Sequence, residues 1–259
     1  MKVAGIVAEY NPFHSGHLYQ ISKIREEFGE GTAIIAIMSG NYTQRAEVAF
    51  CGKDIRARGA VDCGVNLVLE LPFPYCSSSA EIFAESGVCI ADALGIVDYL
   101  SFGSECGDAK KIKACAEIML TAEYALLRDS IYSGDSVGYA EACERAYLKL
   151  LKDPTASIPF TSNNILAIEY TKAILKRKSN IKIHTVKRVG AAYNDTDLDK
   201  GGLSSATAIR RAFSSDLRSP ELLGSLPKKS AKASLMPWSE ATFPRILKKF
   251  LLHLFHSYD

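Results

Sequence analysis

Val3-Ala4-Gly5-Ile6-Val7-Ala8-Glu9-Tyr10-Asn11-Pro12-Phe13-His14-Ser15-Gly16-His17-Leu18 is the stretch that decides the fold. Residues 3–8 form an almost continuous apolar run, which is typical of a strand covered on both faces. Asn11-Pro12 ends that run, and Ile21 and Ile24 then continue an apolar pattern at helical spacing. The stretch therefore predicts a buried parallel strand, a turn and a helix.

Two of the five histidines of the chain, His14 and His17, fall in this turn. The N-terminus of a helix attracts anions, because its first backbone N–H groups are unpaired and its dipole is positive there. Gly16 lets backbone approach a ligand, and imidazole N–H groups there can stabilise charge on a nucleotide α-phosphate. The alternative is that both histidines merely cap a surface turn. Their place beyond the carboxyl end of a strand favours the phosphate site.

Strands and helices alternate along the rest of the chain, as a parallel sheet requires. We therefore expect an α/β fold, a Rossmann-like doubly wound parallel sheet with helices on both faces and a short helical C-terminal appendage. Further strands are predicted at residues 33–38, 65–71, 99–102 and 181–186, and helices at 53–62, 77–94, 110–121, 139–151, 163–176 and 205–213. Ser78 or Ser79 is the expected cap of the helix at 77–94.

The sequence predicts a catalytic domain at residues 1–214, followed by a linker and an amphipathic helix at 245–255. Residues 216–259 carry seven Lys or Arg against four Asp or Glu, which leaves the first 215 residues near −1 when the net charge is +2. This basic end is expected either to contact RNA phosphates or to be a solvated lysine-rich tail.

Composition predicts a cytoplasmic globular protein: hydrophobic residues are 47% and charged residues 23% of 259. No signal peptide and no membrane-spanning run are expected. The seven cysteines are odd in number and show no Cys-x-x-Cys spacing, so reduced thiols are expected. No tightly bound protein metal is expected, because clustered ligands are missing from the sequence.

A second phosphate signature lies at Gly201-Gly202-Leu203-Ser204-Ser205-Ala206-Thr207-Ala208-Ile209-Arg210. Its glycines free the loop, its two serines supply hydroxyls at a helix start, and Arg210 follows within two turns. Such a turn can hold β- and γ-phosphates. An ordinary serine N-cap is the alternative.

Loops after other predicted strands carry further candidates. Arg45 suits a carboxylate or phosphate, and Gly103 can admit an adenine against bare backbone. Asn163-Asn164 starts a helix, and Lys187-Arg188 can face phosphates. The alternatives are that Arg45 is an exposed loop arginine, that Gly103 lies in a plain turn, and that Asn163-Asn164 caps the helix. For Lys187-Arg188 the alternative is an ordinary pair of the basic residues that commonly end a strand.

The His-x-Gly-His turn resembles the signature of nucleotidyltransferases that adenylate or cytidylate a substrate, and these also carry a late Ser-Ser/Thr…Arg turn. Over residues 3–213 the chain resembles the bacterial tRNA(Met) cytidine acetate ligase family. The motifs that carry the resemblance are the stretch at residues 5–17, Met38-Ser39-Gly40-Asn41 with Gln44-Arg45, Glu70-Leu71-Pro72, Phe102-Gly103-Ser104-Glu105, Ser162-Asn163-Asn164-Ile165-Leu166, Arg188-Val189-Gly190-Ala191, and Ser204-Ser205-Ala206-Thr207-Ala208-Ile209-Arg210.

The resemblance implies ATP-dependent activation of acetate to acetyl-adenylate and acetyl transfer to the 4-amino group of the wobble cytidine of elongator tRNA(Met). It implies catalytic roles for His14, His17 and Arg210, and substrate contacts, to acetate or tRNA, for Asn41, Gln44 and Arg45. Magnesium is expected to bridge the phosphates of ATP. The implied ATP contacts are Val7, Ala8, Glu9, Tyr10, Asn11, Pro12, Phe13, His14, Ser15, Gly16, His17, Leu18, Tyr19, Gln20, Gly103, Arg188 and Val189. One of Asn163 and Asn164 is also expected to contact ATP, with Asn163 preferred, and Ser204 and Ser205 are expected to contact its phosphates.

The chain departs from that family after about residue 215, where a larger helical tRNA-binding region is expected. Residues 215–259 are therefore expected to be a shortened remnant of it, with weaker tRNA binding than ATP binding. Two rival functions stay open. One is another adenylyl- or cytidylyltransferase acting on a small phosphorylated substrate, and the other is a nucleotide- or RNA-binding module without catalysis.

Overall fold

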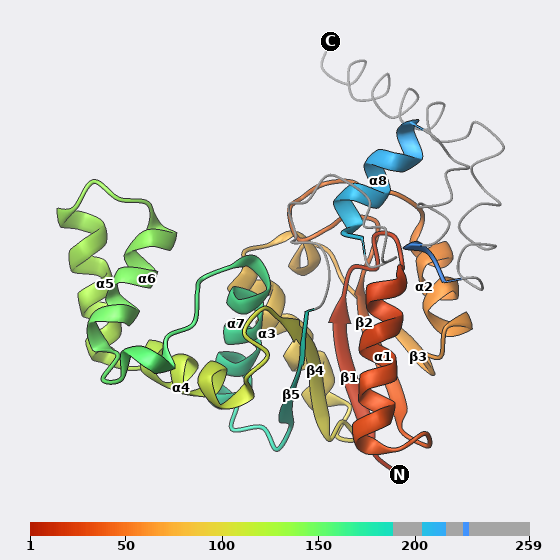
Figure 1. The fold of residues 1–259 in the computed structure, drawn as a ribbon, viewed down its shortest axis with the longest axis horizontal. Helices are drawn as coiled ribbons and strands as arrows, with labels where there is room; N and C mark the ends of the chain where they lie inside the picture. Colours follow the sequence, from red (N-terminus) through yellow and green to blue (C-terminus); the bar gives the residue numbers. More distant parts are fainter. Residues whose placement is uncertain (189–203, 216–224, 228–259) are drawn as a thin grey trace.

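Strand β1 (Val3–Ala8) lies at the centre of a five-stranded parallel sheet in the order β3-β2-β1-β4-β5 (Figure 1). The structure, a computed structural model, describes residues 1–188, 204–215 and 225–227. The other strands are β2 (Ala33–Ser39), β3 (Leu67–Leu71), β4 (Tyr99–Ser104) and β5 (Lys182–Lys187). All four pairings are parallel, so the carboxyl ends of the strands share one edge.

Alternate side chains of β1 enter two hydrophobic cores, one on each face of the sheet. Val3 and Val7 pack in the larger core, whereas Ala4 and Ile6 pack in the smaller one. This explains the unbroken apolar run, because neither face of the strand meets water.

Helices cover both faces, as predicted. The smaller core includes residues of α1 (Ser15–Phe28) and α2 (Lys53–Asp62), and the larger includes residues of α3 (Ala80–Ala93), α4 (Ala109–Met119) and α7 (Ser162–Lys176). Helices α5 (Ala122–Gly134) and α6 (Tyr139–Leu150) project away from the sheet, while α8 (Ala206–Ser215) lies near its carboxyl edge (Figure 1). Short 3-10 turns occur at Tyr75–Ser77 and Pro154–Ala156.

The sequence missed α5 and misplaced several boundaries. Helix α5 has only Tyr124 and Ile131 buried among its described residues, so it shows little apolar periodicity; its N-cap Thr121 accepts from the N–H of Tyr124. Strand β3 begins at Leu67 rather than at residue 65, and Asn66 just before it bonds Ile34 through both its backbone N–H and its side-chain oxygen. The predicted helix at 245–255 lies outside the described residues.

Two further corrections concern helix starts and strand ends. Helix α3 begins at Ala80, with Ser79 as its cap, rather than at residue 77, where a 3-10 turn stands. Strand β4 continues through Gly103 to Ser104, so this glycine lies in a strand and not in a turn.

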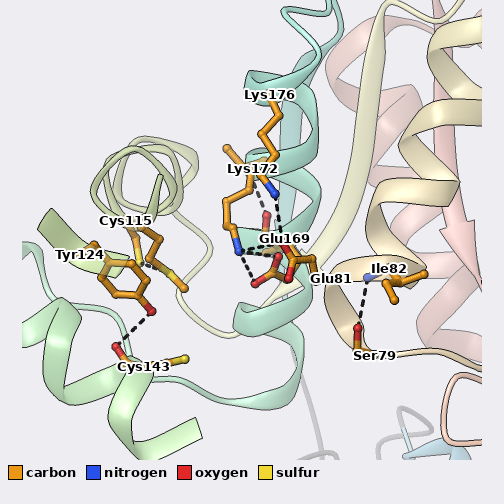
Figure 2. Close-up of polar contacts among 12 residues, drawn as sticks. Ser79, Glu81, Ile82, Cys115, Tyr124, Cys143, Glu169, Lys172 and Lys176 are labelled. Carbon is orange, nitrogen blue, oxygen red and sulfur yellow. Dashed lines mark hydrogen bonds and ion pairs between the residues drawn. The ribbon is translucent and has the colours of Figure 1, made fainter. Parts of the chain in front are cut away.

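A cluster of charged side chains joins α3 to α7 (Figure 2). Lys172 Nζ lies 2.8 Å from a Glu169 carboxylate oxygen and 3.8 Å from Glu81, and Lys176 Nζ lies 3.0 Å from Glu81. Burial raises the pKa of Glu169, while Lys172 beside it opposes that shift. The cluster fixes the packing of two helices that both border the carboxyl edge of the sheet.

All seven cysteines are free thiols, as expected. Among the described helices, none has the length and apolar character needed to cross a membrane.

Candidate nucleotide site

His14 and His17 cap the start of α1 reciprocally. The Nδ1 atom of His14 accepts from the N–H of Gly16 at 3.0 Å, and the Nδ1 atom of His17 accepts from the N–H of His14 at 3.2 Å. Their rings stack, with centroids 3.8 Å apart. Because each Nδ1 accepts a hydrogen bond, each neutral ring carries its proton on Nε2. The turn thus supplies two N–H donors at a helix N-terminus.

Both imidazoles are held in the neutral form. Burial, together with the nearby cations Arg188 and Arg210, lowers the pKa of His14 to about 3. Burial also lowers the pKa of His17 well below its usual value, with His14 and Arg188 acting in the same direction. Neutral donors suit a site that neighbouring arginines already make positive.

Gly16 is required by the packing of this turn. A Cβ atom on Gly16 would lie 2.8 Å from Cε1 and 3.0 Å from Nδ1 of the His14 ring. Any larger residue therefore displaces the imidazole. The glycine of the His-x-Gly-His turn therefore makes room for the ring of the first histidine.

The second predicted phosphate turn meets the first. Arg210 donates from Nη1 to the carbonyl of Asn11 at 2.8 Å, which ties α8 to the loop after β1. Ser205 Oγ accepts from the N–H of Ala208 at 3.0 Å and so caps α8. Ser204 is buried and bonds the hydroxyl of Ser225 at 2.8 Å. Two residues that lie 199 positions apart in the sequence are thus in contact.

Glu9 and Arg56 organise the loops behind the histidines. The Glu9 carboxylate accepts from the N–H of Gln44 at 2.7 Å. Burial raises its pKa, while that hydrogen bond and nearby arginines lower it. Arg56 is buried and donates to the backbone carbonyls of Glu9, Ser39, Gly40 and Cys51. One guanidinium therefore fastens the ends of β1 and β2 together.

The pair Asn163 and Asn164 divides into a cavity residue and a structural residue. Asn164 is fully buried; its Oδ1 accepts from the N–H groups of Glu105 and Cys106, and its Nδ2 donates to Pro159. Asn163 lines the cavity and donates from Nδ2 to Glu105 at 2.6 Å. The N-cap position of α7 is Thr161, and its side chain makes no capping bond.

Glu105 takes the place of that cap. Burial alone would raise the pKa of Glu105, but hydrogen bonds from Asn163, Thr161 and the N–H of Asn164 keep it below its usual value. The carboxylate therefore occupies the N-terminus of α7. A ligand beside α7 meets a neutralised helix end rather than a phosphate site.

These elements enclose a cavity of about 390 Å³ at the carboxyl edge of the sheet. Four cationic side chains line it, namely Arg45, Lys187, Arg188 and Arg210, against the single carboxylate of Glu9 among its described lining residues. Its apolar part is formed by Ala80, Phe83, Phe102, Ile165, Leu166 and Tyr170. The cavity thus has a cationic side suited to phosphates and an apolar side suited to a base.

Most of the sequence-predicted site residues line this cavity. They are Val7, Ala8, Glu9, Tyr10, Asn11, His14, Gly16, His17, Tyr19, Gln20, Gln44, Arg45, Gly103, Asn163, Arg188, Ser204, Ser205 and Arg210. The predicted residues outside the lining are Pro12, Phe13, Ser15, Leu18, Asn41 and Asn164. Val189 and the glycines at 201 and 202 lie outside the described residues.

Sequence reasoning missed Arg56 and the apolar side. The sequence around a single arginine in a helix does not show that its partners are backbone carbonyls. The apolar wall comes from residues that a pattern assigns to the core, such as Phe83 and Leu166. No group of three or more His, Cys, Asp or Glu among the described residues could hold a metal ion.

A parallel sheet in this order, with a cationic cavity at its carboxyl edge and the start of a helix facing it, defines a Rossmann-like nucleotide-binding α/β protein. Within that class, the chain belongs to the HIGH nucleotidyl transferase family, whose model matches residues 1–258.

The relatives are consistent with this membership. The chain is 46% identical over 211 residues to a protein of Caldicellulosiruptor bescii named tRNA(Met) cytidine acetate ligase. The alignment covers 82% of this chain and 52% of that protein. A protein of the same name from Clostridium perfringens is 40% identical over 223 residues, covering 82% and 55%. The chain thus spans about half the length of these relatives.

Solved structures of TmcAL from Thermotoga maritima share the fold. The form bound with alpha-thio ATP superposes with a TM-score of 0.82 at 37% identity, covering 93% of this chain and 56% of that one. The apo form gives 0.84 at 38% identity, covering 93% and 57%.

Proposed function

We propose that this chain activates acetate with ATP to form acetyl-adenylate, and that the acetyl group then passes to the 4-amino group of the wobble cytidine of elongator tRNA(Met). The names of the relatives support the two substrates. The observation that carries the chemistry is the contact of Arg210 with the loop that holds His14 and His17. This contact supports the proposal, because it brings Arg210, the proposed donor to the leaving phosphates, next to the turn with the proposed donors to the α-phosphate.

In the first step, a carboxylate oxygen of acetate attacks the α-phosphorus, and the bond to the bridging oxygen of pyrophosphate breaks. No general base is needed, because acetate is ionised near neutral pH. The Nε2–H groups of His14 and His17 stabilise the charge that builds on the α-phosphate oxygens. Neutral imidazoles donate these hydrogen bonds without giving up a proton.

The leaving pyrophosphate is held by Ser204, Ser205 and Arg210, with Arg188 adding charge. The adenine takes the apolar side of the cavity, near Gly103 and Asn163. Magnesium would enter with ATP as part of the substrate and would offset the charge of its phosphates. Among the described lining residues, Glu9 is the carboxylate that could approach it.

In the second step, the cytidine amine attacks the acetyl carbonyl carbon. The new carbon–nitrogen bond forms, the carbon–oxygen bond to AMP breaks, and the amine loses one proton. The loop that carries Gln44 and Arg45 borders the cavity from the β2 side and is the proposed contact for acetate or tRNA. Asn41 begins the same loop but does not line the cavity; its Oδ1 accepts from the N–H of Lys53 at 3.3 Å.

The test is exchange of radiolabelled pyrophosphate into ATP, which reports adenylate formation. We expect exchange that depends on acetate. Exchange that instead depends on phosphopantetheine or nicotinamide mononucleotide would establish the rival transferase. ATP binding without any exchange would establish the non-catalytic module.

The tRNA half of the proposal has its own measurement. Purified chain, ATP, acetate and tRNA(Met) should yield N4-acetylcytidine, detected by mass spectrometry of the nucleosides. Replacing the wobble cytidine by uridine should abolish the product, because uridine has no 4-amino group.

A further inference from the structure

Two aromatic side chains stand in solvent beside the cavity. Phe73, in the loop after β3, is 68% exposed, and Tyr42, in the loop after β2, is 37% exposed. Their ring centroids lie 5.7 Å apart. Val48, which is 50% exposed, pairs with Tyr42 through an isolated antiparallel bridge. We call Tyr42, Val48 and Phe73 the aromatic rim.

The same loops line the catalytic cavity with other residues. Gln44 and Arg45 follow Tyr42 and line the cavity, as does Ala80 after the Phe73 loop. The two loops are tied together, since Gln44 Nε2 donates to the carbonyl of Ser78 at 2.8 Å and Ser77 Oγ donates to that of Thr43 at 3.0 Å. The aromatic rim is therefore rigidly connected to the wall of the cavity.

The charge beside the rim selects its partner. The cavity carries four cationic side chains against one carboxylate among its described residues, and burial raises the pKa of that carboxylate, Glu9. Two of these cations, Arg45 and Lys187, are not assigned to the phosphates of ATP. Cations next to exposed aromatic rings are the combination that binds single-stranded nucleic acid, because the cations contact the phosphates and the rings stack on bases.

We propose that the aromatic rim is a stacking platform for unpaired RNA nucleotides that flank the base entering the cavity. The proposal rests on the proposed function, since it takes the acceptor to be an RNA loop. A cytidine that reaches the adenylate must leave its neighbours unstacked, and rings at the cavity mouth replace the lost stacking. Three side chains are far fewer than the roughly 20–30 residues a side of a stable protein interface, which disfavours a second copy of the chain.

The experiment compares the double variant Tyr42→Ala/Phe73→Ala with the wild-type chain. The probe is a fluorescein-labelled RNA stem-loop with the tRNA(Met) anticodon loop, and binding is measured by anisotropy. Loss of base stacking weakens binding by about 5- to 150-fold for each base that a ring supports. Acetate-dependent pyrophosphate exchange should be unchanged, which also shows that the variant is folded.

A matched control exists far from the cavity. Tyr132 in α5 and Tyr139 in α6 are each 52% exposed, and their rings lie 5.6 Å apart. The variant Tyr132→Ala/Tyr139→Ala removes a similar aromatic pair from helices that project away from the sheet (Figure 1), so it should bind the stem-loop as the wild type does. Phe73→Trp should retain binding, whereas Phe73→Leu should lose it, because stacking needs a planar ring.

Several outcomes would overturn the proposal: equal binding by the rim double variant and the wild type, no binding by the wild type, or full binding by Phe73→Leu. Dimerisation of the wild type that the rim variant abolishes would assign the rim to a second copy instead. Failure of the proposed function has a different signature, namely stem-loop binding that depends on the rim with no acetate-dependent exchange.

Discussion

The imidazoles of His14 and His17 lie face to face, with centroids 3.8 Å apart, and each uses its Nδ1 to accept a backbone N–H of the turn that holds them. Two neutral rings can stack this closely, whereas two imidazolium ions would repel each other. The arrangement fixes the proton of each ring on Nε2. The bonds that cap the helix thus also orient the two N–H groups that we propose as catalytic donors.

We predict that His17→Ala slows acetate-dependent pyrophosphate exchange by about 100- to 1000-fold, since a preorganised donor to developing charge typically contributes about 2.7–4 kcal/mol. Loss of the cap adds a smaller loss of stability, measurable by urea unfolding. The control is His184→Gln, which alters a buried histidine that bonds Ser101 and Glu27 outside the cavity. Exchange near the wild-type rate in folded His17→Ala would remove the histidine from the mechanism.

Arg210→Lys should weaken the use of ATP while leaving the apparent affinity for acetate unchanged. Lysine keeps the positive charge, but it lacks the forked geometry with which the guanidinium bonds Asn11 and Thr207 and is proposed to hold the phosphates. The measurement is the KM for each substrate in the exchange assay. A raised KM for acetate with an unchanged KM for ATP would reassign Arg210 to the acetate site.

Alanine substitutions of the two neighbouring asparagines should affect different properties, stability for Asn164 and ATP binding for Asn163. Asn164→Ala leaves the N–H groups of Glu105 and Cys106 without their acceptor in a buried place, so the free energy of unfolding should fall by about 3 kcal/mol. Asn163→Ala should cost little stability and raise the KM for ATP, because this side chain lines the cavity. Urea unfolding and exchange kinetics on both variants check the division. A stable Asn164→Ala chain with a raised KM for ATP would reverse it.

The buried histidines should make stability fall in mild acid. Histidine in the unfolded chain titrates near pH 6.5, whereas burial lowers the pKa of His14 to about 3 and that of His17 well below its usual value. Below pH 6.5 the unfolded chain therefore binds protons that the folded chain does not, and each such histidine lowers the free energy of unfolding by up to about 1.4 kcal/mol per pH unit. Above pH 6.5 this contribution to stability is fully present.

Urea unfolding between pH 7 and pH 5 measures that slope. His17→Asn, which removes one titrating ring, should give a shallower slope than the wild type. The exchange rate should show no step at the usual histidine pKa, since both rings stay neutral throughout this range. A step near pH 6.5 would mean that one of them titrates in the folded protein.

Local sequence determined most of the helices and strands and the position of the first predicted phosphate turn. Unbroken apolar runs identified β1 and β2, and the change from an apolar run to helical spacing placed His14 and His17 at the start of α1. The matching of many short motifs to one family also identified the relatives correctly. Such signals are readable because strand burial, turn chemistry and helix capping depend on neighbours in the chain.

The tertiary structure alone decided which residues meet. That Arg210 bonds Asn11, that Asn164 supports the backbone while Asn163 faces the cavity, and that Arg56 fastens two strand ends are consequences of packing between distant segments. Helix α5 escaped detection because little of it is buried, so no apolar period marks it. Nearby residues in the sequence set the local preference for helix, strand or turn. The burial that keeps His14 and His17 neutral exists only once the chain has folded around them.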